Sequence, residues 1–252
     1  MAIGLGHLIM GVRCQSSGEE AAGKLRKEFP SASIAVWVVD MALYTSVRAI
    51  AAKCAGLERI DLIMLNAGLI KSEFTVSPET QNEPTLQVNY LSTMLLAVLL
   101  LPILKAKKIA GATPVLSVIG SDLSYHTTIE FPWYKRTKLL QIMFVSKLAE
   151  YISPEHVIIH ARMEQALLSR SVHVAASTYV DAVLAQGTDS HGSFVCDWTI
   201  KPYPPFWYSS EGKDFRSRLW DETMAELEFA GVLEIVESVE ELHANRLSHR
   251  YA

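Results

Sequence analysis

Residues 60–68 read Ile60-Asp-Leu-Ile-Met-Leu-Asn-Ala-Gly68, an apolar run that ends directly in an Asn-Ala-Gly turn. A short apolar run bounded by a glycine turn is typical of a buried strand. Strand and helix patterns alternate on both sides of it, which favours βαβ units. We therefore predict an α/β fold built on a doubly wound parallel sheet, with one domain over residues 1–230 and a tail over residues 231–252.

Outward from this strand, the pattern predicts the other elements by residue range. Further strands are expected at 7–12, 33–39, 114–119, 157–161 and 192–197. Helices are expected at 18–29, 44–55, 84–107, 134–152, 172–185 and 212–230. Residues 201–207 contain three prolines and are expected to form a loop, whereas the segment after Gly231 is left open between a short helix and a frayed end.

Composition limits the classes of function. The chain has 252 residues, 50% of them hydrophobic, and a formal net charge of −4 without any long block of like charges, which disfavours nucleic acid and anionic membranes as partners. The apolar run 91–104 is too short to span a bilayer and is expected to be a buried helix. Three widely spaced cysteines, Cys14, Cys54 and Cys196, favour a reducing compartment over disulfides or zinc, so a cytoplasmic location is expected.

A candidate for proton-transfer chemistry lies at the start of the helix expected at 134–152. Tyr134 and Lys138 are four residues apart, so both side chains lie on one helix face. An ammonium group one turn away favours the phenolate and lowers a tyrosine pKa from its usual value of about 10. Ser121, at the end of the strand expected at 114–119, can hold a substrate oxygen while the tyrosine transfers its proton. The alternative is ordinary packing of a tyrosine near a lysine.

Four groups of residues in this order resemble the short-chain dehydrogenase/reductase family. They are Leu65-Asn-Ala-Gly68, Val88-Asn89-Tyr90, Ser121 and Tyr134-Lys-Arg-Thr-Lys138. Phe144-Val-Ser-Lys-Leu-Ala149 and Ser190-His-Gly192 are similar to fungal members associated with secondary metabolism. The resemblance implies a Rossmann-like fold and a small hydrophobic substrate of natural-product type.

The resemblance also implies roles for the catalytic residues. Tyr134 is the expected general acid/base, and Lys138 assists it while contacting the nicotinamide ribose. Ser121 is expected to polarise the substrate carbonyl or hydroxyl, and Asn89 to hold the geometry of a proton relay. For Asn89, bridging a helix kink is the alternative.

For the cofactor, the resemblance implies contacts by residues nearer the N-terminus. Asp40 matches the acidic residue that meets the adenine, and Asn66 with Gly68 matches the wall beside the adenine ribose. Arg13 lies where a basic residue meets a 2′-phosphate, so NADP is expected in preference to NAD. The alternatives are a helix cap for Asp40, a solvated charge for Arg13 and a simple turn for residues 66–68.

Two parts of the family pattern are not found in this sequence. One is the first strand with its Thr-Gly-x-x-x-Gly-x-Gly turn, which Gly4-Leu-Gly6 does not replace because no strand precedes it. The other is the Pro-Gly lid, since Arg162 directly follows Ala161. The expected fold is therefore truncated at the first strand and at the substrate lid.

Three functions follow from these residues. The first is an NADP-dependent oxidoreductase acting on a carbonyl or a secondary alcohol. The second is a cofactor-independent isomerase, dehydratase or cyclase that uses Tyr134 and Lys138 for proton transfer alone. The third is a non-catalytic partner in a homo- or hetero-dimer formed through helices 84–107 and 134–152.

Overall fold

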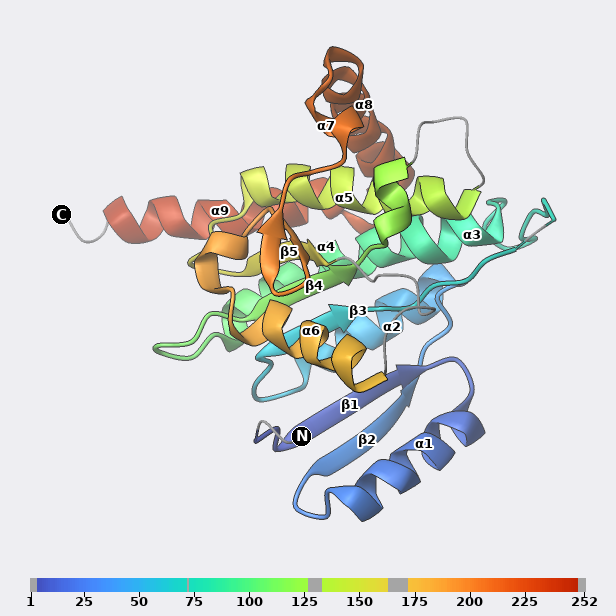
Figure 1. The fold of residues 1–252 in the computed structure, drawn as a ribbon. Helices are drawn as coiled ribbons and strands as arrows, with labels where there is room; N and C mark the ends of the chain where they lie inside the picture. Colours follow the sequence, from blue (N-terminus) through green and yellow to red (C-terminus); the bar gives the residue numbers. More distant parts are fainter. Residues whose placement is uncertain (1–3, 72, 127–132, 163–171, 249–252) are drawn as a thin grey trace.

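The computed structural model describes residues 4–71, 73–126, 133–162 and 172–248. Its strands follow the predicted order along the chain (Figure 1). They are β1 (His7–Val12), β2 (Ser33–Val38), β3 (Leu62–Leu65), β4 (Val115–Ile119), β5 (Ile158–Arg162), β6 (Phe194–Cys196) and β7 (Thr199–Lys201).

Helices connect these strands and continue beyond the last one. The α-helices are α1 (Gln15–Glu28), α2 (Tyr44–Ala55), α3 (Pro84–Leu86), α4 (Ser92–Lys107), α5 (Trp133–Tyr151), α6 (Val172–Leu184), α7 (Pro205–Tyr208), α8 (Ser210–Glu226) and α9 (Val232–Ser248). A π-helical turn, η1 (Gln87–Leu91), joins α3 to α4, and short 3₁₀ turns are η2 (Asp122–His126), η3 (Gly187–Ser190) and η4 (Glu228–Ala230).

The strands form two sheets. One contains β1 and β2, and the other has the order β3-β4-β5-β6-β7, in which only β7 is antiparallel. The predicted α/β fold with a parallel sheet is confirmed. Within the described residues β1 pairs only with β2 and β3 only with β4, so no strand joins the two sheets.

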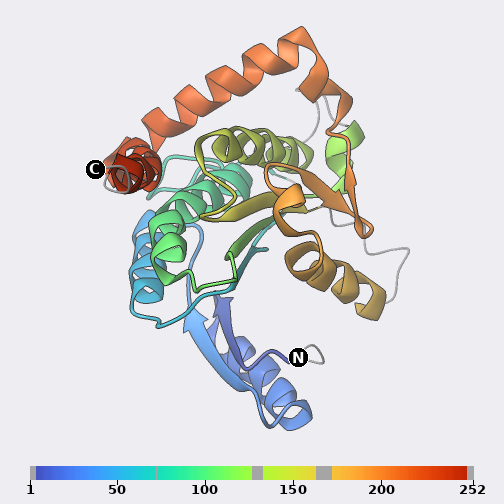
Figure 2. The same ribbon diagram turned by 90° about the vertical axis from the view of Figure 1, so that its left-hand side faces the viewer.

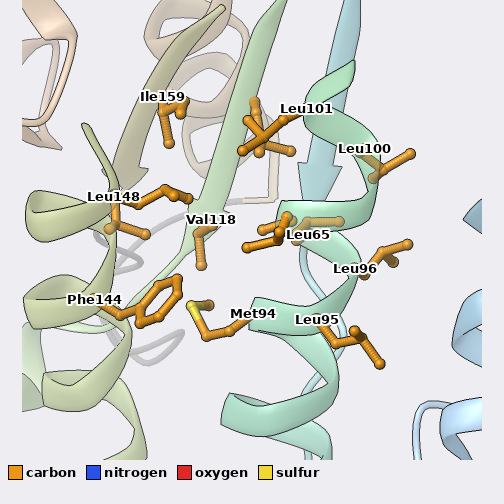
Figure 3. Packing of buried hydrophobic residues seen from close by; sticks show 14 of the residues in the cluster. Leu65, Met94, Leu95, Leu96, Leu100, Leu101, Val118, Phe144, Leu148 and Ile159 are labelled. Atoms are coloured by element: carbon orange, nitrogen blue, oxygen red, sulfur yellow. The ribbon is translucent and has the colours of Figure 1, made fainter. Parts of the chain in front are cut away.

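The main hydrophobic core surrounds the five-stranded sheet. Helix α4 is buried on nearly every side, as its apolar sequence predicts, and packs between the sheet and other helices. Figure 3 shows the side chains that meet there: Leu65, Met94, Leu95, Leu96, Leu100, Leu101, Val118, Phe144, Leu148 and Ile159. The stretch Pro84–Lys107 is long and apolar enough to cross a membrane, but 78% of its apolar window is buried inside the fold, as in a core helix.

The β1–α1–β2 unit lies outside this main core. Its buried residues include Ala22 and Ile34, yet neither belongs to the cluster around the five-stranded sheet. Figure 2 shows the unit extending away from the rest of the molecule. The first two strands are therefore supported by α1 and by each other more than by the body of the protein.

A buried histidine ties two central strands to the turn η3. His160 on β5 lies between Ser117 on β4, at 3.0 Å, and Ser190 of η3, at 3.1 Å. The Ser190 hydroxyl donates to the Gly187 carbonyl, so Ser190 Oγ accepts the proton of His160 Nδ1 and His160 Nε2 accepts from Ser117. This arrangement needs a neutral ring, and burial first of all lowers the pKa of His160 to about 4.

Of the segments after β6, the one expected as a proline-rich loop differs from the prediction. Asp197 and Trp198 both have positive φ and form a two-residue hairpin turn that connects β6 to the antiparallel strand β7. Part of the segment expected as a proline-rich loop therefore belongs to β7 and to helix α7. The segment after Gly231 is the 17-residue helix α9, which buries Val232, Val236 and Val239 and packs against α4.

Candidate active site

The turn after β3 is held by Asn89. Its side-chain Oδ1 accepts from the Leu69 backbone N–H at 2.8 Å, and its Nδ2 donates to the Leu69 carbonyl at 2.9 Å. Gly68 lies beside this amide, since a Cβ added there would lie 3.4 Å from Asn89 Oδ1 and 3.9 Å from Lys138 Nζ. Asn66 and Gly68 are exposed, so the two residues form an accessible surface over Asn89 and Lys138.

Tyr134 and Lys138 lie in the first turns of α5, on the same face. Lys138 is almost fully buried, and its Nζ donates to the Ile119 carbonyl at 2.7 Å, at the end of β4. The same Nζ is 5.8 Å from the centre of the Tyr134 ring. A cation is thus fixed near the phenol by the backbone of a central strand.

Ser121 is buried just beyond β4, where η2 begins. Its hydroxyl donates to Asp122 Oδ1 at 3.2 Å and accepts from the Leu123 N–H at 3.3 Å. In this conformation the hydroxyl holds the η2 turn. To donate to a substrate oxygen, it must rotate away from Asp122.

Arg13 and Asp40 belong to the other sheet. They follow β1 and β2, which are joined beyond their ends by a hydrogen bond from the Val39 N–H to the Val12 carbonyl. Asp40 Oδ1 accepts from the Ala42 N–H at 2.9 Å, whereas the N-cap of α2 is Leu43. Asp40 therefore orders the turn before α2 without capping the helix.

The loop that contains Arg13 stabilises negative charge. Arg13 is exposed and makes no ion pair or hydrogen bond within the described ranges. Next to it, hydrogen bonds from Ser16 and then Ser17 lower the pKa of the exposed Cys14 thiol to about 6. Donors at the start of α1, together with a guanidinium, suit a phosphate group.

The structure thus brings together Gly68, Asn89, Tyr134 and Lys138, and it places Ser121 at the neighbouring strand end. In parallel sheets, ligands bind beyond the carboxyl ends of the strands. Gly68 and Ser121 lie just beyond the carboxyl ends of β3 and β4. Arg13 and Asp40 follow strands of the separate two-stranded sheet. Among the described residues, no group of three or more His, Cys, Asp or Glu side chains could hold a metal ion.

Two buried polar residues of α5 were missed by the sequence analysis. Thr137 accepts from Asn89 Nδ2 at 3.2 Å and donates to the Tyr134 carbonyl at 2.8 Å. Gln141 donates to the Asn89 carbonyl at 2.6 Å. The sequence does contain a signal for them, since the polar positions 134, 137, 138 and 141 share one face of an otherwise apolar helix.

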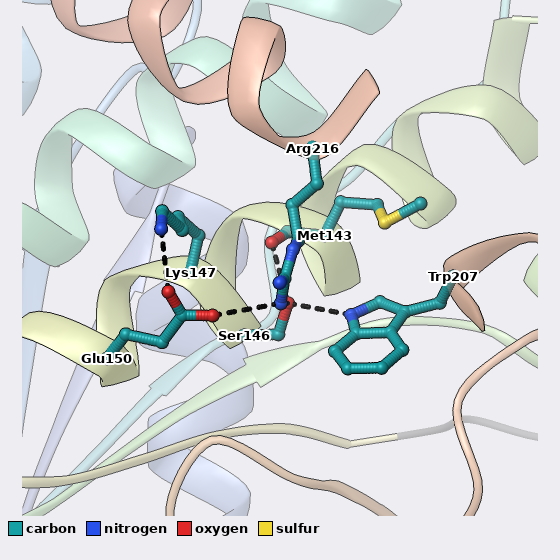
Figure 4. Close-up of polar contacts among 6 residues, drawn as sticks. All are labelled: Met143, Ser146, Lys147, Glu150, Trp207 and Arg216. Carbon is teal, nitrogen blue, oxygen red and sulfur yellow. Dashed lines mark hydrogen bonds and ion pairs between the residues drawn. The ribbon is translucent and has the colours of Figure 1, made fainter. Parts of the chain in front are cut away.

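The opposite side of α5 is fixed by the segment after β7. Figure 4 shows Trp207 Nε1 donating to Ser146 Oγ at 3.0 Å, and Arg216 forming an ion pair with Glu150 at 3.0 Å. Lys147 contacts the same carboxylate at 2.6 Å. Helix α5 is therefore fixed from two sides, which limits its movement relative to β4.

A family model and a close fungal relative match most of this chain. Residues 4–169 match the family model described as short chain dehydrogenase. The short chain dehydrogenase virL of Hypocrea virens is 49% identical over a gapped alignment of 278 positions that covers 94% of this chain and 82% of the relative.

Solved structures show the same fold at low sequence identity. A short-chain dehydrogenase from Sphingobium yanoikuyae in complex with NADPH has a TM-score of 0.60 and 16% identity, covering 87% of this chain and 85% of its own. A 3-ketoacyl-(acyl-carrier-protein) reductase from Brucella melitensis complexed with NADH has a TM-score of 0.58 and 17% identity, covering 75% of this chain and 84% of its own.

Proposed function

This chain belongs to the short-chain dehydrogenase family, and we propose that it is an NADP-dependent oxidoreductase that reduces a ketone or oxidises a secondary alcohol on a hydrophobic natural product. One observation carries the proposal. The Lys138 ammonium, fixed by the Ile119 carbonyl, lies near both the Tyr134 ring and the exposed Gly68 turn. A proton donor, a cation and an accessible backbone surface therefore meet at one sheet edge.

The residues present fit a nicotinamide nucleotide in two places. At Gly68 the missing side chain leaves room for a ribose to approach Asn89 and Lys138, with Asn66 alongside. The exposed Arg13 and the donors of Ser16 and Ser17 suit a 2′-phosphate, which supports NADP over NAD, and Asp40 follows the neighbouring strand. When bound, the nicotinamide exchanges a hydride with the substrate carbon.

The chain's own residues handle the proton. Tyr134 donates its phenolic proton to the substrate oxygen as that oxygen gains negative charge, and the nearby Lys138 ammonium stabilises the phenolate that remains. Ser121, once turned from Asp122, donates a second hydrogen bond to the same oxygen. In the oxidation direction the same groups act in reverse.

An apolar substrate is supported by the hairpin after β6. The turn Asp197–Trp198 follows β6 at the sheet edge where Ser121 follows β4. Trp198 and Ile200 expose 45% and 42% of their surface on this hairpin. Exposed large apolar groups beside a reaction site favour binding of an apolar molecule.

Replacing Tyr134 by Phe tests the proposal directly. Loss of the proton donor is expected to lower kcat by about 10² to 10⁴ with NADPH and a carbonyl substrate, while leaving the fold intact. Tyr151→Phe is the matched control, because it removes a hydroxyl at the far end of α5 and is expected to keep full turnover. Equal activity of Tyr134→Phe and the parent would remove Tyr134 from the mechanism.

A second candidate is proton transfer without a nucleotide. It is favoured by the position of Arg13 and Asp40, which follow the strands of the two-stranded sheet, whereas Tyr134 and Lys138 lie on helix α5, which packs on the five-stranded sheet. Calorimetric titration with NADPH separates the two. Micromolar binding supports the oxidoreductase, and turnover of a substrate by nucleotide-free protein supports an isomerase, dehydratase or cyclase.

A further inference from the structure

Gln141 links the two helices that carry the proton-transfer residues. It is fully buried on α5, one turn after Lys138, and its Nε2 donates to the Asn89 backbone carbonyl at 2.6 Å. Asn89 in turn binds both backbone polar groups of Leu69. A continuous chain of amides therefore runs from α5 through η1 to the turn after β3.

The π-helical turn η1 explains how side chains come to bind its carbonyls. The Ser92 N–H bonds to the Gln87 carbonyl, five residues back, so the normal ladder of hydrogen bonds is interrupted. Thr93 Oγ1 donates to the Val88 carbonyl at 2.9 Å, and Gln141 Nε2 donates to the Asn89 carbonyl. Helix α5 thereby sets the position of the turn that carries the Asn89 side chain.

The other end of the Gln141 amide has a different environment. Its orientation is fixed, because reversing the amide would place two acceptors 2.6 Å apart. Within the described part of the chain, no hydrogen-bond donor reaches the buried Oε1. A buried oxygen left without a donor costs about 1 to 3 kcal/mol, so packing alone does not account for a glutamine here. Buried oxygens of this kind commonly hold a water molecule.

We propose that Gln141 is a positioning residue for proton transfer at Tyr134. Its Nε2 fixes the Asn89 carbonyl, and its Oε1 accepts from a water molecule that also contacts the Lys138 ammonium one helical turn away. The inference rests on the proposed function, because it gives Lys138 and Asn89 their role at Tyr134. Gln141 itself touches neither substrate nor cofactor.

The test compares Gln141→Met with Gln87→Met. Gln87 is an equally buried amide in η1, the π turn that carries Asn89, but both its ends are satisfied, by Ser92 at 2.8 Å and Asn82 at 2.9 Å. Both variants are expected to lower Tm. Only Gln141→Met is expected to lower kcat, on the order of tenfold, and to move the midpoint of its pH profile upward because Lys138 is less well placed.

A second readout needs neither cofactor nor turnover. The absorbance titration of each protein, minus that of the same protein carrying Tyr134→Phe, isolates the Tyr134 phenolate. Its midpoint is expected to rise in Gln141→Met and stay unchanged in Gln87→Met, even if the protein proves to have no redox activity. An equal midpoint in both variants, with Tm lowered, would assign Gln141 to structure only.

A charged variant covers the case in which Gln141→Met does not fold. Gln141→Glu keeps the shape of the side chain and places an acid one helical turn from Lys138. Once ionised, it loses the hydrogen bond to Asn89 and competes for the ammonium, so the Tyr134 midpoint is again expected to rise. A midpoint equal to that of the parent would overturn the proposal.

Discussion

Asn89 illustrates how single polar residues hold this site together. Its side chain binds the backbone N–H and carbonyl of Leu69 and the hydroxyl of Thr137, and its own carbonyl accepts from Gln141. The motif Val-Asn-Tyr identified Asn89 from the sequence, whereas Thr137 and Gln141 stood in an apolar helix without a motif of their own. A contact between residues about fifty positions apart depends on how two helices pack, which one-dimensional patterns do not give.

The prediction that the protein prefers NADP to NAD depends on Arg13. Its guanidinium has no partner in the described part of the chain and adjoins donors that favour an anion. Arg13→Ala is therefore expected to weaken NADPH binding by about tenfold or more and to leave NADH binding nearly unchanged, because only NADPH has the 2′-phosphate. Calorimetric titration with each nucleotide measures both affinities.

Arg48→Ala serves as the control for this comparison. Arg48 is an exposed arginine of α2, so the variant has the same change in net charge but leaves the loop after β1 unchanged. Parallel losses of NADH and NADPH affinity in Arg13→Ala would show that the residue supports the fold of the loop rather than the phosphate.

At the scale of elements, periodicity predicted most helices and strands well. The bounds of α2 agree at both ends, and β1 agrees completely. The stretch 84–107 was predicted as one helix, yet it contains the π turn η1, because an interrupted hydrogen-bond ladder leaves the apolar pattern almost unchanged. The β6–β7 hairpin was missed because its turn uses Asp197 and Trp198, which have positive φ without a glycine signal.

His160, which links β4, β5 and η3 through its hydrogen bonds to Ser117 and Ser190, predicts that acid destabilises the fold. The pKa of His160 falls from its usual 6.5 to about 4 on folding, so the unfolded chain binds the proton more tightly. The stability from the neutral ring is complete above pH 6.5 and is lost as pH falls toward 4. Urea unfolding at pH 7 and pH 4.5 should show a smaller acid-induced loss for His160→Gln than for the parent, by roughly 1 to 3 kcal/mol.

His7→Gln is the control for this pH effect, since His7 is exposed at the start of β1. It is expected to retain the parent's dependence on pH. If His160→Gln shows the same loss between pH 7 and pH 4.5 as the parent and His7→Gln, the buried ring is not the source of acid sensitivity.

For the whole molecule, the C-terminal helices bear on the expected dimer. Helix α9 packs on α4, and α8 packs on α5, where Trp220 stacks on Phe144 and Tyr151. The two helices proposed for an intermolecular contact thus bury apolar surface within their own chain. We infer from this packing that the chain is a monomer, and light scattering after size exclusion measures its mass. The dimer predicted through 84–107 and 134–152 is the opposite outcome of the same measurement.

Two substitutions on α9 sharpen this prediction. Val236 is 1% exposed and Leu233 is 45% exposed on the same helix. Val236→Asp is expected to loosen α9, uncover α4 and cause association, whereas Leu233→Asp should remain monomeric. A parent chain that elutes as a stable dimer would overturn this inference and support pairing through 84–107 and 134–152.

The sequence predicted the fold class but not how the parts of the molecule are supported. Val232, Val236 and Val239 recur at helical spacing, so the helix after Gly231 was detectable, although its packing on α4 was not. The division into two sheets depends on which strands become neighbours in space. Local patterns fix strand positions along the chain and leave that pairing open.

The separate β1–α1–β2 unit has a consequence for affinity. Among the described residues each of its strands pairs with one other strand and has little share in the main core, so opening this unit locally should require much less free energy than unfolding the body. A nucleotide held at Arg13 would then spend part of its binding energy on keeping the unit ordered. Its measured affinity would report a local unfolding equilibrium as well as the contacts themselves.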